Sequence, residues 1–197
     1  FGTYSDYLYF RYDKGDDEGA VNLLGKLNAY LREAKNRYVR PIVSDRYDQP
    51  GDMFDSHTYR KGAVVLHMLR NLLGDEQFFA VLSHFLHRYA FDAVDTNDFI
   101  RSVKTVTGQN LDWFFDQWLF KPGHPVFDVR SDWDPARKIV VLKVAQVQDF
   151  TRGIPVFRAP LSVAIVNAAG RSTSQVWIRE REETFEFPSE TRPLLVR

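Results

Sequence analysis

The segment HTYRKGAVVLHMLR places a phenol and two cations, Tyr59, Arg60 and Lys61, at the head of an apolar helical pattern. The first turn of a helix has unpaired backbone N–H groups and the positive end of the helix dipole, and both favour developing negative charge. A phenol in that position is suited to donate a hydrogen bond to an oxyanion. Gly62 and Ala63 follow at three and four residues, which predicts that another backbone comes close on that face. The alternative is a buried helical tyrosine whose hydroxyl finds a partner.

The histidines and the acidic run DKGDDEG carry side chains that can bind metal ions. None of the five histidines is followed by Glu, so the H-E-x-x-H zinc signature is absent. His84 and His87 lie one helical turn apart and could share a metal, but no third ligand is evident. A solvated helix face is the simpler interpretation of this pair. The acidic run does not follow the spacing of a calcium-binding EF-hand, so its charges are interpreted as helix N-terminal and solubilising.

The composition excludes several functional classes. Formal net charge is zero, with 26 basic and 26 acidic residues, so nucleic acid and anionic membranes are not predicted partners. No apolar run approaches the roughly 20 residues of a membrane span. Without cysteine, the chain has no disulfide, thiol nucleophile or Cys-based metal site. A G-x-S-x-G elbow and a Gly-rich phosphate loop are also absent.

Apolar residues recur at helical spacing up to about residue 120, which predicts five or six helices joined by short connections. Trp113, Phe114, Phe115 and Trp118 are interpreted as core and domain-interface anchors. The predicted inner faces are Tyr4, Leu8 and Tyr12; Val21, Leu24, Leu27 and Leu31; and Phe78, Val81, Leu82, Phe85 and Leu86.

Local signals predict where these helices begin and end. Asp75, Thr96 and Asn110 stand directly before apolar helical patterns and are predicted N-caps. Gly74 and Gly108 stand after such patterns and are predicted to end helices.

The periodicity changes from 3.6 to 2 after the sequence KPGHP. KIVVLKVAQ, PLSVAIVNA, SQVWIRE and ETFEFP are predicted strands, with NAAGR as a turn between two of them. Short strands at this spacing indicate a small antiparallel β-sandwich. The predicted fold is therefore an α + β chain in two units, with an all-α unit at 1–124 and the sandwich at 125–197.

Four separate segments are similar to one known family. TYRKGAVVLHMLRNLLGDEQF resembles the Y-x-K-G-A region of the M1 family of zinc aminopeptidases, gluzincins that include aminopeptidase N and leukotriene A4 hydrolase. DTNDFIRSVKTVTGQNLDWFFDQWLFKPGHPVFDV resembles the family's later helix, tG-x-(D/N)-L, aromatic run, QW and G-x-P. The family has a thermolysin-like catalytic domain followed by a small β-sandwich. VAQVQ and IPVFRAPLSV resemble strands of that sandwich. FGTYSDYL resembles the residues that follow the family's glutamate zinc ligand.

This resemblance implies a zinc-dependent metallopeptidase, an aminopeptidase that hydrolyses bonds near the N-terminus of peptide substrates. It places the three zinc ligands and the exopeptidase anchor upstream of Phe1, in missing N-terminal domains of the same polypeptide. We therefore expect a piece of a longer parent, with zinc in that parent and no zinc ligand or activity in this chain alone. The one catalytic position implied within the chain is Tyr59, which stabilises the tetrahedral intermediate. The alternative is a non-catalytic M1-like scaffold or interaction module.

Overall fold

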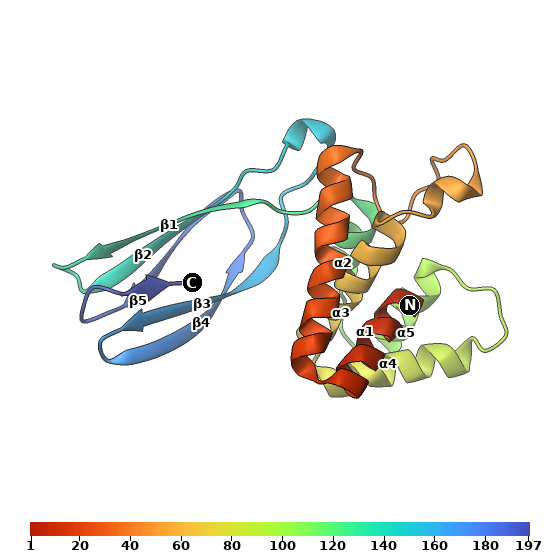
Figure 1. The fold of residues 1–197 in the computed structure, drawn as a ribbon, viewed down its shortest axis with the longest axis horizontal. Helices are drawn as coiled ribbons and strands as arrows, with labels where there is room; N and C mark the ends of the chain where they lie inside the picture. Colours follow the sequence, from red (N-terminus) through yellow and green to blue (C-terminus); the bar gives the residue numbers. More distant parts are fainter. The chain divides into compact units, whose positions relative to one another are not determined.

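The computed structural model describes all 197 residues, which divide into a helical unit, Phe1–Gly123, and a β unit, His124–Arg197 (Figure 1). The predicted α + β fold class is confirmed. The helices are α1 (Gly2–Lys14), α2 (Asp16–Asn36), α3 (Gly62–Leu73), α4 (Asp75–Arg88), α5 (Thr96–Thr107) and α6 (Asp112–Phe115). Shorter turns are η1 (Pro50–Met53), η2 (His57–Lys61), η3 (Asp116–Phe120) and η4 (Phe150–Arg152). No helix is long and apolar enough to cross a membrane.

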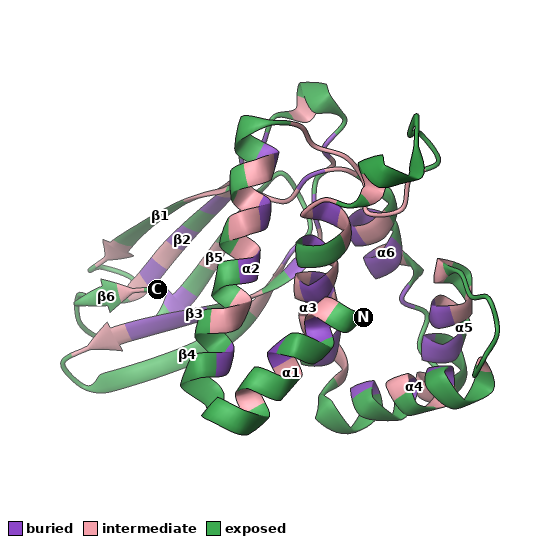
Figure 2. Ribbon diagram, turned by 45° about the vertical axis from the view of Figure 1, so that its right-hand side comes forward, coloured by how far each residue is buried: buried purple, intermediate pink, exposed green.

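The core of the helical unit is rich in aromatic residues. Phe78 and Val81 of α4 are fully buried, and Tyr4 of α1 is 2% exposed. The Tyr4 ring meets the Phe78 ring edge to face, with centroids 5.8 Å apart. Phe114, Phe115 and Trp118 are buried as predicted. Figure 2 shows buried and exposed residues alternating along α2 and α3, as expected for helices with one packed face.

The predicted inner faces of α1 and α2 are partly wrong. Tyr12 is 89% exposed, and Tyr7 joins Tyr4 in the core instead. On α2 the Val21 and Leu24 side chains face solvent. The buried residues of that helix are Gly19, Lys26, Tyr30 and Ala34. This face is buried because α1 and η2 pack against it. Contacts between helices, and not the apolar pattern of one helix alone, decide which face of the helix is buried. On α4, Leu86 is likewise exposed.

All three predicted helix caps lie one residue from the observed N-caps, which are Gly74, Asp95 and Leu111. Asp75 is the first residue of α4, not its cap, and its carboxylate binds the Arg70 guanidinium at 2.6 and 2.7 Å. For α5 the cap is Asp95 rather than Thr96, and Asp95 accepts hydrogen bonds from the first-turn N–H groups. For α6 the N-cap is Leu111 rather than Asn110, although Asn110 Oδ1 accepts the Asp112 N–H at 2.8 Å.

The β unit contains two three-stranded antiparallel sheets, β1-β2-β5 and β4-β3-β6 (Figure 1). The strands are β1 (Phe127–Asp134), β2 (Ile139–Gln146), β3 (Ala159–Asn167), β4 (Gly170–Ile178), β5 (Glu182–Pro188) and β6 (Leu195–Val196). Both sheets contribute to one apolar core, with Val140 and Val144 from the first and Ile165 and Ile178 from the second. The four predicted strands are confirmed. Strand β1 was not predicted: Phe127, Val129 and Trp133 alternate with charged residues, but Ser131 interrupts the apolar series and the four middle residues are exposed.

Candidate functional site

Tyr59 lies in η2, a five-residue π turn that leads directly into α3. The Lys61 N–H donates to the Ser56 carbonyl at 2.8 Å, which is the i→i+5 bond of a π turn. The Tyr59 N–H donates to the Asp55 carbonyl at 3.2 Å. Single π turns of this kind are frequent at functional sites because they redirect one side chain relative to a regular helix.

The unpaired first-turn N–H groups expected beside Tyr59 are not free. The Ser56 N–H donates to Glu33 Oε2 at 2.7 Å, and the Thr58 N–H donates to Asp55 Oδ1 at 2.9 Å. Two carboxylates therefore already occupy the anion-binding positions at this helix start. Any oxyanion stabilisation at this position rests on the Tyr59 hydroxyl and not on the backbone.

The two cations beside Tyr59 point in different directions, because successive helical residues are about 100° apart. Arg60 is exposed, whereas Lys61 is 2% exposed. The Lys61 ammonium lies 5.6 Å from the centre of the Tyr30 ring and has no hydrogen-bond partner. Burial lowers the pKa of Lys61 to about 7. The expected cluster of cations around the phenol is therefore not formed.

The Tyr59 side chain is 42% exposed, so the alternative of a buried core tyrosine is wrong. Its ring lies 5.8 Å from the Phe54 ring and lines a cavity of about 500 Å³. The cavity wall is mainly apolar. Its residues come from the start of the chain and α1, from η2 with α3, from α4, α5, α6 and η3, and from loops between helices: among them Phe1, Ile42, Val43, Gly62, Ala63, Val65, Leu66, Leu69, Phe85, Phe99, Phe115 and Leu119.

Gly62 was predicted to allow a close backbone approach, and the structure contradicts this. A Cβ atom added at Gly62 would meet nothing within 4 Å. Gly62 instead lines the cavity, so the missing side chain leaves space next to Tyr59. Ala63, by contrast, is buried at 3% exposure.

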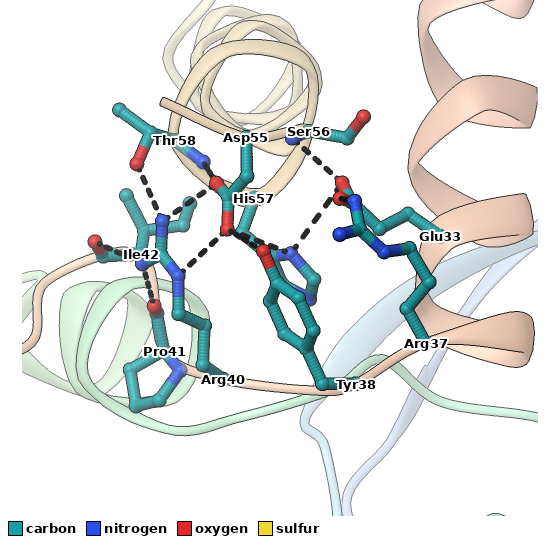
Figure 3. A network of polar contacts seen from close by, with 10 residues as sticks. All are labelled: Glu33, Arg37, Tyr38, Arg40, Pro41, Ile42, Asp55, Ser56, His57 and Thr58. Atoms are coloured by element: carbon teal, nitrogen blue, oxygen red, sulfur yellow. Dashed lines mark hydrogen bonds and ion pairs between the residues drawn. The ribbon is translucent and has the colours of Figure 1, made fainter. Parts of the chain in front are cut away.

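A buried polar network holds η2 from below (Figure 3). Arg40 donates to both carboxylate oxygens of Asp55, and the Tyr38 hydroxyl donates to Asp55 Oδ2 at 2.9 Å. His57 is fully buried, with Nδ1 3.4 Å from Asp55 Oδ2 and 3.8 Å from Glu33 Oε2. Burial lowers the pKa of His57, and the Asp55 charge only partly opposes this.

The sequence pattern does not predict this network, because its members come from α2, an irregular loop and η2. One local signal was available. Asp55 stands three residues before Thr58, the spacing at which a side chain caps a backbone N–H.

None of the histidine, aspartate and glutamate residues of the chain form a group of three or more that could hold a metal ion. His87 Nδ1 lies 2.8 Å from the Ser83 carbonyl, and His87 is exposed. In the acidic run, Asp16 pairs with Arg11 at 2.5 Å and begins α2. The residues of this chain therefore do not fit a zinc site, whatever role zinc has in relatives.

Three comparisons relate the chain to known proteins. A model of the peptidase family M1 domain matches residues 1–118. Aminopeptidase N of Lactococcus lactis subsp. lactis is 35% identical over 112 residues, which cover 55% of this chain and 13% of that protein. Transcription initiation factor TFIID subunit 2 of Drosophila melanogaster is 30% identical over 124 residues, which cover 56% of this chain and 10% of that protein.

The solved structure of Legionella pneumophila aminopeptidase A in complex with aspartic acid has the same fold over 97% of this chain, with a TM-score of 0.72 and 21% identity. The chain spans 21% of that structure, so it matches only a part of each of these relatives. The match to the family model covers the helical unit up to Trp118 and includes the turn that carries Tyr59. The chain belongs to peptidase family M1.

Proposed function

We propose that the full-length protein is a zinc-dependent aminopeptidase and that Tyr59 of this chain donates a hydrogen bond to the oxyanion of its tetrahedral intermediate. One observation carries this proposal: a half-exposed phenol lies on a fixed π turn and lines a cavity of about 500 Å³. A hydroxyl held at the wall of a largely apolar cavity acts in a low dielectric, where one donor contributes more than in water.

In this proposal, Tyr59 and the metal-binding groups have different roles. Tyr59 supplies a proton donor and no charge, so its bond strengthens as negative charge develops on the substrate oxygen. The metal-binding groups lie outside this chain, since no cluster within it could hold zinc. Membership of a peptidase family supports peptides as the substrates. The chain by itself is accordingly proposed to be inactive.

The test is Tyr59→Phe in the full-length protein. Removing the hydroxyl should lower kcat by roughly 10²–10³, the usual effect of losing one oxyanion donor. KM should change little, because the bond matters mainly in the transition state. Tyr9→Phe is the matched control, since Tyr9 is 63% exposed on α1 and does not line the cavity. Near-normal turnover of the Tyr59 variant, with only a lower melting temperature, would refute the assignment.

A second candidate is a non-catalytic scaffold with the M1 fold. Its support is the similarity to a protein named as a subunit of a transcription initiation factor and not as a peptidase. The helical core and the sandwich need no catalytic groups to fold. Zinc analysis of the purified full-length protein separates the two candidates: about one zinc per polypeptide with hydrolysis of aminoacyl substrates supports the enzyme, and absence of both supports the scaffold.

A further inference from the structure

Asp55 controls the π turn that carries Tyr59 through two acceptors. Its backbone carbonyl receives the Tyr59 N–H at 3.2 Å, and its carboxylate Oδ1 receives the Thr58 N–H at 2.9 Å. One residue therefore fixes the backbone at Tyr59 and at the position before it. The bond to Oδ1 depends on the orientation of the Asp55 side chain, so a rotation of that side chain would remove one of the two bonds that fix the turn.

Arg40 holds the Asp55 carboxylate in a two-point contact. Its Nε donates to Oδ2 at 2.8 Å and its Nη2 donates to Oδ1 at 2.6 Å. The same Nη2 donates to Thr58 Oγ1 at 2.7 Å, so Arg40 binds the turn twice. Both side chains are removed from water, with 14% and 5% exposure. Burial alone would raise the pKa of Asp55, but the hydrogen bonds from Arg40 and from the Thr58 N–H hold that pKa below its usual value.

The guanidinium is itself oriented by the chain. Arg40 Nη1 donates to the Pro41 carbonyl at 2.6 Å and to the Ile42 carbonyl at 3.1 Å. All three guanidinium nitrogens therefore have acceptors, which leaves the Arg40 side chain one orientation (Figure 3). Ile42 lines the same cavity as Tyr59, so the contacts of Arg40 with this segment also order part of the cavity wall.

Aromatic stacking and a second carboxylate complete the support. The Tyr38 ring stacks on the His57 ring, with centroids 5.3 Å apart and planes 13° from parallel. Tyr38 also donates to Asp55, and Glu33 caps the Ser56 N–H from α2. The turn is therefore fixed from α2, from the loop after it and from within, which is the pattern of a preorganised site.

We propose that Asp55, held by Arg40, is a positioning residue that aims the Tyr59 hydroxyl at the reacting oxygen. This inference rests on the proposed role of Tyr59. It assigns the buried Arg40–Asp55 pair to catalysis through geometry and not to stability alone. Misplacement of a catalytic group by about 1 Å can cost roughly 10²-fold in rate, so a change at Asp55 should be visible in kcat.

A double-mutant cycle in the full-length protein tests this. Asp55→Asn keeps the shape of the side chain and removes its charge. We expect kcat to fall by roughly 10–100-fold with KM changed less than about threefold. If Asp55 acts through Tyr59, Asp55→Asn should cost less than about twofold when added to Tyr59→Phe. Two effects that multiply in the double variant would overturn the proposal.

Asp75→Asn is the matched control. The Arg70–Asp75 pair has the same two-point geometry, with Nε and Nη2 donating at 2.7 and 2.6 Å, but lies at the far end of α3. This variant should leave kcat and KM within about twofold of the starting protein. If Asp55→Asn does not fold, Arg40→Lys takes its place in the cycle, because lysine keeps the charge but not the fork.

Amide hydrogen exchange tests the positioning without catalysis. In the full-length protein, Asp55→Asn should speed exchange at the Tyr59 amide about tenfold or more, and Asp75→Asn should not. Unchanged exchange at Tyr59 would overturn the positioning role whatever the kinetics show. Faster exchange together with normal turnover of Tyr59→Phe would instead refute the proposed function and leave the structural coupling of Asp55 to Tyr59 intact.

Discussion

Lys61 should make the stability of the helical unit depend on pH. Its side chain is 2% exposed, and its ammonium has no hydrogen-bond partner and no carboxylate in ion-pair contact. The Tyr30 ring 5.6 Å away gives partial compensation through a cation–π contact. Burial, with a smaller contribution from the Arg40 charge, lowers the pKa of Lys61 from 10.5 to about 7.

The sign of the effect follows from proton binding. Below pH 7 both the folded and the unfolded chain hold the Lys61 proton, so the folded state bears the full cost of the buried charge. Between pH 7 and 10.5 the unfolded chain still binds the proton and the folded chain does not, so stability rises with pH. The pKa of Lys61 is lowered from 10.5 to about 7, and at 1.36 kcal/mol per pKa unit this corresponds to roughly 5 kcal/mol in the free energy of unfolding.

Lys61→Met removes the charge and keeps a flexible side chain of similar size. At pH 6 we expect the variant to unfold with a free energy about 3–5 kcal/mol higher than the original chain, a gain that shrinks towards pH 10. Urea unfolding followed by ellipticity at 222 nm, at several pH values, measures this for the helices. The exposed Lys104 on α5 provides the control substitution, Lys104→Met, which should not change the slope with pH. A variant less stable at pH 6, or an original chain whose stability is flat from pH 7 to 10, would refute the reasoning.

Three further predictions concern packing, capping and metal. Gly19→Ala should destabilise the protein by about 1–3 kcal/mol, because the added Cβ would lie 2.8 Å from Arg11 Cβ. Gly25→Ala in the same helix adds a Cβ that meets nothing within 4 Å, so it should stabilise the protein by up to about 1 kcal/mol. Urea denaturation of both variants measures these changes. Asp95→Ala should cost about 1 kcal/mol through loss of the α5 cap, seen as a lower melting temperature. After dialysis against zinc, metal analysis of the 197-residue chain should give far less than one zinc per chain, and a ratio near one would revive the histidine pair of α4 as ligands.

The helix and strand assignments could be predicted largely from local pattern. The 3.6-residue periodicity placed α3 and α4, and alternation placed β2 to β5, because both signals arise within one element. The three predicted caps lie one residue from the observed N-caps, and the Asp75 carboxylate binds Arg70 instead of capping α4. The inner face of α2 was misassigned because Lys26 and Tyr30 are buried by neighbours that the local pattern does not contain.

The local pattern of a phenol at a helix start followed by small residues drew attention to Tyr59, and the resemblance of four segments in order indicated the M1 family and a catalytic role for Tyr59. The catalytic role of Tyr59 stays a prediction. Only the tertiary structure decided what surrounds it: the carboxylates of Glu33 and Asp55 on the first-turn N–H groups, Arg40 beneath them, and Lys61 turned inward without a partner. These contacts join α2, the following loop and η2, and the buried charges of Arg40 and Asp55 are stabilised because the folded chain supplies donors and acceptors at hydrogen-bond distance. That condition depends on how separate elements meet, which spacing along one segment does not encode.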